Sequence, residues 1–211
     1  MRGAFVTIEG IEGVGKTTSL DTVRETLGRS GIAFRITREP GGTALGERLR
    51  ELLLHADDGE PVRGETEALL MFAARAQHLS LVIEPALERG EWVVCDRFTD
   101  ATFAYQGGGR GVDTEFLECL RDGVQRGREP DLTLLLDAPV EVGWARIANR
   151  SHDRFERERK EFFERVRRAY LYLAERNPAR IKVIDATQSR EAVAREIDAV
   201  LGRFVAEWKA R

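Results

Sequence analysis

The sequence contains few of the residues that build metal centres or disulfide-stabilised folds. Its 211 residues include two cysteines, Cys95 and Cys119, and three histidines. The cysteines form no CxxC pair and no histidine cluster accompanies them, so we expect neither a zinc site nor a disulfide framework. Cys95 lies in an apolar run and is expected to be a buried free thiol.

An excess of positive charge and long apolar runs are also missing. The net charge is −3, which argues against a nucleic-acid partner bound through bulk positive charge. No run is long enough to span a membrane, and no stretch of signal-peptide type precedes the first expected strand. We therefore expect a cytoplasmic protein that binds neither nucleic acid nor a membrane.

What the sequence does contain is enough apolar residues for a core, arranged in alternating strand and helix patterns. Hydrophobic residues make up 42% and charged residues 33% of the chain. Parallel pairing through right-handed crossovers follows when helices separate successive strands. The pattern predicts a three-layer α/β fold, with a five-stranded parallel sheet flanked by helices, as a single domain over residues 1–211. Strands are expected at 4–9, 32–37, 92–95, 132–136 and 181–184, and helices at 16–29, 44–55, 65–89, 139–149 and 189–209.

Two further helical features stand out. Pro85 is expected to bend the long helix at 65–89. Phe162, Val166, Tyr170 and Leu173 form one apolar stripe on another helix. Between them, residues 146–160 are dense in Arg and Glu and poor in apolar residues, which is typical of a solvated helix face or of a mobile lid.

The strongest motif lies at residues 10–17. An expected strand precedes it and an expected helix follows it, as a P-loop requires. Its glycines allow successive backbone N–H groups to turn inward around phosphate oxygens, and the helix N-terminus adds its positive dipole end. Lys16 is expected to reach the β- and γ-phosphates of ATP, and the Thr17 hydroxyl to ligate Mg²⁺. The motif reads Gly10-Ile11-Glu12-Gly13-Val14-Gly15-Lys16-Thr17, with Thr18 next, and matches G-x-x-x-x-G-K-S/T in full.

A P-loop alone does not name a substrate, but other segments narrow the choice. The chain lacks the guanine-reading Asn-Lys-x-Asp of switch GTPases, and its short length and Arg-rich stretch favour a small-molecule kinase. Several motifs together resemble bacterial thymidylate kinase, in order along essentially the whole chain. They are Thr37-Arg38-Glu39-Pro40-Gly41-Gly42-Thr43, Phe72 to His78, Asp96-Arg97-Phe98, Ala104 to Gly111, Pro130 to Thr133, and Asp185-Ala186-Thr187.

This resemblance implies an ATP-dependent kinase that transfers the γ-phosphoryl group to dTMP, giving ADP and dTDP in dTTP biosynthesis. It also implies a homodimer, with the helix at 65–89 as candidate interface. Arg97 and Arg75 are similar to the arginines that hold the phosphate of the acceptor, and a guanidinium suits that role because it grips phosphate bidentately. Arg38 and Glu39 fall in the matched substrate-binding segment. Asp96 is similar to the residue that organises either the Mg²⁺ hydration shell or Arg97.

The resemblance also assigns residues to the base and the sugar. Phe72 resembles the aromatic residue that stacks on thymine, but its spacing to Arg75 is one residue short, which would place Met71 in that position. Thr102 and Gln106 match residues that hydrogen-bond the base. Tyr105 matches a tyrosine against the sugar, where it would disfavour a ribose 2′-OH. Glu12 matches a carboxylate near the acceptor sugar and phosphates.

The P-loop has no arginine of its own, so the resemblance points to lid arginines as the source of catalytic charge. Arg146, Arg150 and Arg154 are the candidates, although Ala148 and Asn149 interrupt the series. We favour Arg150 as the catalytic residue and place Arg146 at the ATP site.

Three other functions remain open at this point. The first is a kinase for a different nucleoside or nucleotide, which turnover of a panel of acceptors distinguishes. A non-catalytic nucleotide-binding regulator is disfavoured by the intact Lys16, Thr17 and Arg97. An ATP-driven nucleic-acid enzyme is disfavoured by the acidic balance and the short chain.

Overall fold

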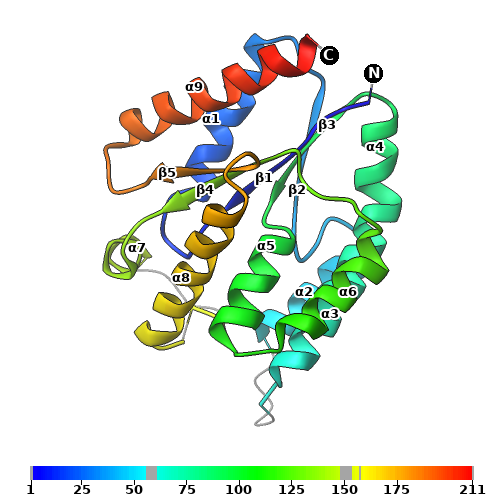
Figure 1. The fold of residues 1–211 in the computed structure, drawn as a ribbon, viewed down its shortest axis with the longest axis vertical. Helices are drawn as coiled ribbons and strands as arrows, with labels where there is room; N and C mark the ends of the chain where they lie inside the picture. Colours follow the sequence, from blue (N-terminus) through cyan, green and yellow to red (C-terminus); the bar gives the residue numbers. More distant parts are fainter. Residues whose placement is uncertain (1, 56–60, 148–153, 157, 211) are drawn as a thin grey trace.

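The computed structural model describes residues 2–55, 61–147, 154–156 and 158–210. Its centre is a parallel five-stranded sheet in the order β2-β3-β1-β4-β5 (Figure 1). This confirms the predicted sheet, although β2 begins two residues later than expected. The strands are β1 Phe5–Glu9, β2 Phe34–Arg38, β3 Trp92–Asp96, β4 Leu132–Asp137 and β5 Ile181–Asp185.

Helices cover both faces of the sheet (Figure 1). The helices α1 and α9 pack together on one side of the sheet. Helix α8 and the helices α3 to α6 lie on the other side. The helices are α1 Lys16–Arg29, α2 Ala44–His55, α3 Gly64–His78, α4 Glu84–Glu88, α5 Thr99–Thr102, α6 Thr114–Gln125, α7 Val140–Ile147, α8 Lys160–Arg176 and α9 Arg190–Lys209, with π-helical stretches η1 Leu79–Ile83 and η2 Phe103–Gly109. The last two residues of the helix expected at 139–149 lie outside the described residues.

Successive side chains of strand β1 point to opposite faces of the sheet and so belong to two different apolar clusters. Val6 and Ile8 of β1 belong to the larger apolar cluster, which includes Val23 of α1 and Ile197 of α9. Phe5, on the opposite face of β1, packs in a second cluster with residues of η1 and α4. Because successive side chains of a strand point to opposite faces, burial on both sides produces the continuous apolar runs seen in the sequence.

The long helix expected at 65–89 is present but changes its winding. It runs as α3, passes through the π-helical stretch η1, and continues as α4, which contains Pro85. Proline has no N–H to donate to the preceding turn, and the wider η1 turn lies directly before it. Pro85 therefore coincides with a change of helical register.

Two helices, the short α5 and the longer α6, were not predicted. Helix α6 begins after Asp113, whose carboxylate accepts a hydrogen bond from the Glu115 backbone N–H at 3.2 Å. Leu117 is buried on its inner face, and Leu120 and Val124 pack beside it. The N-cap and the apolar spacing were both visible in the sequence.

The sheet topology determines where a ligand can bind. Strand β1 lies between β3 and β4, so the chain leaves towards one side of the sheet after β1 and returns to the other side at β4. Open α/β sheets bind ligands at the carboxyl ends of the strands beside such a switch point. Residues 10–17 follow β1 there, Asp96 ends β3, and Arg97 follows it.

Candidate active site

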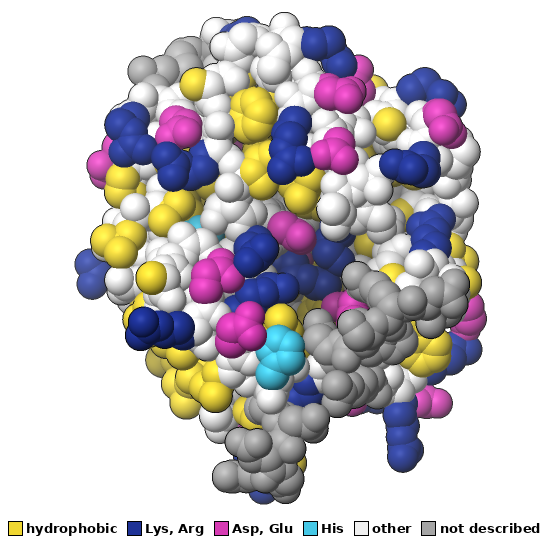
Figure 2. All heavy atoms as spheres, turned by 180° about the vertical axis from the view of Figure 1, so that it is seen from behind, with side chains coloured by type: hydrophobic (Ala, Val, Ile, Leu, Met, Phe, Trp, Pro, Cys, Tyr) yellow, Lys and Arg dark blue, Asp and Glu magenta, His cyan; other side chains and the backbone are white. Residues whose placement is uncertain are grey.

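A cavity of about 810 Å³ lies at the carboxyl ends of the strands. Figure 2 shows Lys and Arg side chains gathered in a hollow near the centre of one face of the molecule. The cavity brings together most of the residues that the sequence nominated. Those on its wall are Glu12, Gly13, Gly15, Lys16, Thr17, Thr18, Glu39, Arg75, Asp96, Arg97, Thr102, Tyr105, Gln106 and Arg146.

The P-loop forms one side of the cavity through its backbone. Gly13 and Gly15 have φ angles of 74° and 97°, values that suit glycine. The loop also packs closely against α7, because a Cβ atom on Gly13 would lie 2.0 Å from the carbonyl oxygen of Gly143. Ile11 and Val14, each 3% exposed, turn their side chains into the core. The motif thus needs glycine both for its turn and for its contact with α7.

Lys16 lies back over its own loop. Its Nζ donates hydrogen bonds to the carbonyl oxygens of Gly10 at 2.9 Å and Ile11 at 2.8 Å. Burial and the positive charge of Arg97 lower the pKa of Lys16 to about 8, although Glu12 and Asp96 oppose the shift. A polyanion in the cavity would favour the charged ammonium form and is therefore a suitable ligand.

Arg97 stands at the junction of the P-loop and the rest of the cavity. Its Nη2 donates to Glu12 Oε1 at 2.8 Å, its Nη1 donates to the Tyr170 hydroxyl at 3.2 Å, and its guanidinium lies 4.7 Å from the centre of the Tyr105 ring. Its backbone has a φ of 69°, an unfavourable value for a residue with a side chain. Such strain costs on the order of 1–3 kcal/mol and is concentrated at functional sites. The strained residue, Arg97, is therefore also the one whose guanidinium binds the P-loop carboxylate of Glu12.

Tyrosine hydroxyls extend this network. The Tyr105 hydroxyl donates to Glu12, 2.7 Å from each carboxylate oxygen. The Tyr170 hydroxyl donates to Glu9 Oε2 at 2.7 Å. Burial and the charge of Asp100 raise the pKa of Glu9 to about 8. Tyr170, predicted only as a core residue, therefore links the end of β1 to Arg97.

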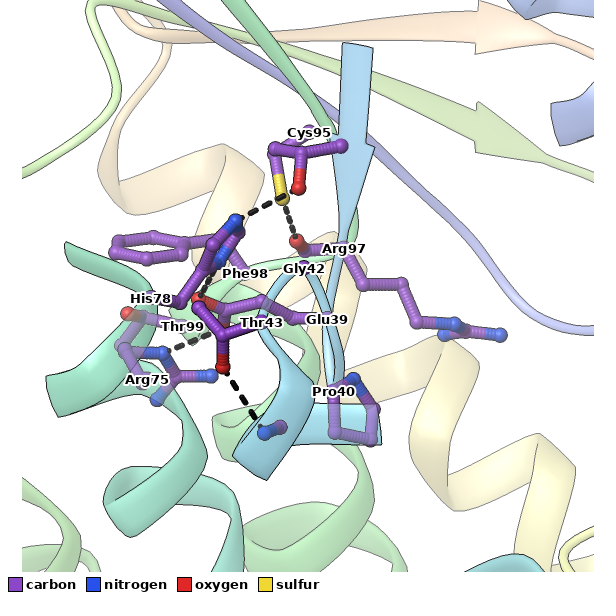
Figure 3. A network of polar contacts seen from close by, with 12 residues as sticks. Glu39, Pro40, Gly42, Thr43, Arg75, His78, Cys95, Arg97, Phe98 and Thr99 are labelled. Atoms are coloured by element: carbon purple, nitrogen blue, oxygen red, sulfur yellow. Dashed lines mark hydrogen bonds and ion pairs between the residues drawn. The ribbon is translucent and has the colours of Figure 1, made fainter. Parts of the chain in front are cut away.

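Arg75 is held in a second, fully buried network (Figure 3). Its Nε donates to Glu39 Oε2 at 2.7 Å and its Nη2 donates to Thr102 Oγ1 at 3.0 Å. The guanidinium lies 4.6 Å from the ring centre of Phe72 and 4.9 Å from that of Phe98. Its Nη1 is buried without a hydrogen-bond partner among the described residues. Arg75 is thus rigidly placed on the cavity wall with one donor nitrogen left over.

The carboxylate that holds Arg75 is itself held by a histidine. His78 Nδ1 is 2.9 Å from Glu39 Oε1, and His78 Nε2 is 2.7 Å from Thr37 Oγ1. In Figure 3 the Arg97 side chain points away from this network. Arg75 and Arg97 therefore both line the cavity, but each is held by a different hydrogen-bond network.

We call the side of the cavity formed by Glu39, Met71, Arg75, Thr102 and Gln106 the α3 wall. It combines a thioether, a guanidinium, a hydroxyl and an amide, which together suit a flat ligand with polar edges. All four of its polar members are at most 4% exposed. Its geometry is therefore set by packing before any ligand binds.

Two residues nominated for substrate binding lie away from the cavity. Phe72 is 1% exposed and packs with Ala68 and Leu117 in a core cluster, while the neighbouring Met71 lines the cavity. Of the two residues that the sequence left open, Met71 therefore lies on the cavity wall, because one helical step turns the Phe72 ring towards α6. Arg38 is exposed and paired with Glu47 at 2.8 Å, so it is also not part of the wall.

The lid arginines differ in their positions. Arg146 lines the cavity and donates to the Ala186 carbonyl oxygen at 3.0 Å. Arg154 donates to the Leu53 carbonyl oxygen at 2.8 Å and to Glu67 Oε1 at 2.7 Å. Arg150 lies outside the described residues, as do residues 148–153 and 157 of the predicted lid.

Two oxygen groups near the P-loop suit a hard cation. Asp96 Oδ1 is buried without a hydrogen-bond partner among the described residues, and Thr17 and Asp96 both line the cavity. The described residues contain no group of three or more His, Cys, Asp or Glu side chains that could hold a metal ion by themselves. Mg²⁺ commonly binds through one or two protein oxygens together with water and phosphate. The residues present therefore fit a Mg²⁺ ion shared with a bound nucleotide.

Sequence reasoning missed Glu67 and gave His78 no role. Glu67 is 0% exposed and contacts Gln106, Arg110 and Arg154. Its only signal was an acidic residue directly before the apolar run at 68–72. A surface position explains such a residue equally well.

Comparisons with known proteins agree with this site. A family model described as thymidylate kinase matches residues 8–197. A thymidylate kinase of Alkalilimnicola ehrlichii is 56% identical over 209 residues, which is 98% of this chain and 96% of that protein. One of Pseudomonas putida strain GB-1 is 57% identical, over 97% of this chain and 98% of that protein. A crystal structure of thymidylate kinase from Ehrlichia chaffeensis superposes with a TM-score of 0.74 at 33% identity, covering 95% of this chain and 99% of that one.

Proposed function

The chain belongs to the thymidylate kinase family, and from this premise we propose how its cavity transfers the γ-phosphoryl group of ATP to dTMP, giving ADP and dTDP. One observation carries the proposal: Lys16 and Thr17 of the P-loop share a single cavity with Arg97 and the α3 wall. A donor and an acceptor nucleotide can therefore meet end to end inside it.

Binding of ATP begins at the P-loop. The backbone N–H groups of residues 10–17 and the N-terminus of α1 surround the phosphates, with Thr18 at the same end of the helix. Lys16 exchanges its two carbonyl partners for phosphate oxygens, whose negative charge favours the ammonium form that burial disfavours. Arg146, beside the 185–187 segment, contacts the nucleotide from the opposite side.

The acceptor binds between Arg97 and the α3 wall. Arg97 grips the phosphate of dTMP, with Arg75 as a second donor through its unpartnered Nη1. Met71 covers the face of thymine, and Thr102 and Gln106 contact its edge. Tyr105, fixed by Glu12, lies against the sugar and disfavours a 2′-OH.

Phosphoryl transfer depends more on aligning the two nucleotides than on acid–base groups. The phosphate oxygen of the acceptor is already a nucleophile, so no strong general base is required. Lys16 and Arg97 supply positive charge around the moving group, and Glu12 keeps Arg97 oriented. We propose that Thr17 and Asp96 hold Mg²⁺, whose contribution when bound is to offset the negative charge of the phosphates.

A lid arginine completes the set of charges. Arg154 is already committed to Glu67 and Leu53, which leaves Arg150 as our candidate. Arg150→Ala should lower kcat by about 10²-fold, as expected for the loss of one transition-state donor. Binding of dTMP, measured by calorimetry, should stay the same. An unchanged kcat would remove Arg150 from the mechanism.

Turnover with a panel of acceptors tests the function as a whole. Purified protein with ATP and Mg²⁺ should phosphorylate dTMP strongly, dUMP less well, and dCMP, AMP and GMP poorly, as followed by ADP release. Preference for another acceptor would contradict the substrate. Absence of ADP release with all of them would contradict the kinase activity.

The remaining properties are proposed from the family. We infer that residues 1–211 act as one kinase domain with a lid at about 146–160, and that the protein is a cytoplasmic homodimer. Among the described residues, no helix is both long and apolar enough to cross a membrane. Leu69 and Leu81, exposed by 51% and 59% on α3 and η1, support an interface on this helical segment. Light scattering of the wild type and of Leu69→Glu tests the dimer.

A further inference from the structure

Glu67, in the first turn of α3, is a fully buried carboxylate directly behind the α3 wall. Arg154 Nη1 donates to its Oε1 at 2.7 Å, and Arg110 Nε lies 3.2 Å from Oε1 and 3.3 Å from Oε2. Gln106 Nε2 donates to the other oxygen, Oε2, at 3.0 Å. A buried charge is tolerated only when it is paired and hydrogen-bonded, and this one has partners on both oxygens.

This arrangement decides which way the Gln106 amide faces. An amide can present either its oxygen or its NH₂ group, and the two orientations are nearly equal in shape. A carboxylate accepts hydrogen bonds and cannot donate them, so the Gln106 NH₂ must face Glu67. Gln106 also lines the cavity and is 1% exposed. The carbonyl oxygen, Oε1, is therefore the end available to a ligand.

We propose that Glu67 is a positioning residue that sets the hydrogen-bond polarity with which the cavity reads the acceptor base. An accepting oxygen matches the N3–H of thymine or uracil. Cytosine carries a lone pair at N3, so it would face the Gln106 oxygen with two acceptors opposed. The inference rests on the proposed contact between Gln106 and the base, and it extends that contact to discrimination against 4-aminopyrimidine nucleotides.

The substitution Glu67→Gln should reverse this polarity. Arg154 donates to Oε1 alone, and Arg110 lies slightly nearer to Oε1 than to Oε2, so the oxygen of the new amide should take the place of Oε1. Its NH₂ would then replace Oε2 and face Gln106, which must turn its own oxygen inward to accept. The Gln106 NH₂ would consequently face the base. We expect the ratio of kcat/KM for dTMP to kcat/KM for dCMP to fall by about tenfold or more, in line with one mispaired buried polar group.

Glu158→Gln is the matched control. Glu158 pairs with Arg110 in the same cluster, so this variant removes an equal charge without touching Gln106. Its dTMP to dCMP ratio should match the wild type. A wild-type ratio in folded Glu67→Gln would overturn the inference, whereas dTMP turnover by the wild type would leave the proposed function intact.

A measurement on the wild type covers the case in which Glu67→Gln does not fold. Calorimetry should show that N3-methyl-dTMP, which lacks the N3–H, binds at least tenfold more weakly than dTMP, while dUMP, which keeps the N3–H, should lose less affinity than N3-methyl-dTMP does. Equal binding of N3-methyl-dTMP would overturn the inference. In addition, Gln106→Leu should abolish the selectivity; if it does not, the base contact itself is wrong.

Discussion

The P-loop and the α3 wall face each other across one cavity but are built in opposite ways. The P-loop is a run of consecutive residues that binds through its backbone, and its glycines fix its shape. The α3 wall is made of side chains from the end of β2, from α3 and from the segment 99–109, and buried ion pairs such as Glu39–Arg75 fix its shape. One site depends on local sequence, and the other depends on tertiary contacts.

This difference has energetic consequences. Removing a P-loop side chain leaves in place the backbone N–H groups that surround the phosphates, so the main loss should be in the rate of phosphoryl transfer. Removing one member of a buried ion pair leaves its partner charged and unpaired, so the loss should spread to binding and stability. Arg97 lies between the two regions, because it follows β3 and its guanidinium contacts Glu12 of the P-loop.

Lys16→Met should give the largest effect on the P-loop side. Lys16 donates only to carbonyl oxygens of its own loop, so the fold should persist. Loss of its charge should lower kcat by about 10²–10³-fold, with little change in dTMP affinity. Steady-state kinetics and dTMP calorimetry check this. An equal loss of dTMP affinity would show that the two regions are not separable.

Arg97→Ala should give the largest effect on acceptor binding. The variant loses the phosphate contact and leaves Glu12 unpaired, so the dTMP dissociation constant should rise by about 10²-fold or more. Arg97→Lys is the control, since it keeps the charge but not the planar fork, and it should recover only part of the affinity. Isothermal titration measures both, and normal dTMP affinity in Arg97→Ala would refute the assignment.

The contrast between local sequence and tertiary contacts also explains which features could be predicted from the sequence. The sheet, the P-loop and most helices follow from local patterns, and so do Lys16 and Thr17. The helix α6 was missed although Asp113 and Leu117 carried its signal. Burial of Glu67 and His78 was not predictable, because their charged partners are distant in sequence; Glu67 and Arg154, for example, are 87 positions apart.

The choice between Met71 and Phe72 shows a second limit. Both residues are apolar and adjacent, and a helix places them about 100° apart. Which one faces the cavity depends on the rotation of α3 against α6, where Phe72 packs with Leu117. A single sequence fixes the periodicity of a helix better than its rotation against its neighbours.

The pH dependence of ATP binding tests the environment of Lys16. Its pKa of about 8 in the nucleotide-free cavity lies below the ordinary value of 10.5, because burial and Arg97 disfavour the ammonium. Below pH 8 Lys16 is already charged, so affinity for ATP should be flat. Above pH 8 binding must recover a proton, so the dissociation constant should rise about tenfold per pH unit. The rise should be absent in Lys16→Met and present in Thr102→Ser, a change on the α3 wall.

The smallest expected effects separate two neighbours on α3. Met71→Ala should raise the KM for dTMP roughly fivefold, equivalent to about 1 kcal/mol of lost apolar contact, with almost unchanged thermal stability. Phe72→Leu should instead lower the free energy of unfolding by about 1 kcal/mol and leave the KM nearly constant, because its ring lies in the core and only supports Arg75. Thermal melts and dTMP kinetics on both variants show which of the two residues contacts the base and which supports the core. If Phe72→Leu raised the KM more than Met71→Ala did, the rotation of α3 relative to the bound base would have to be reassigned.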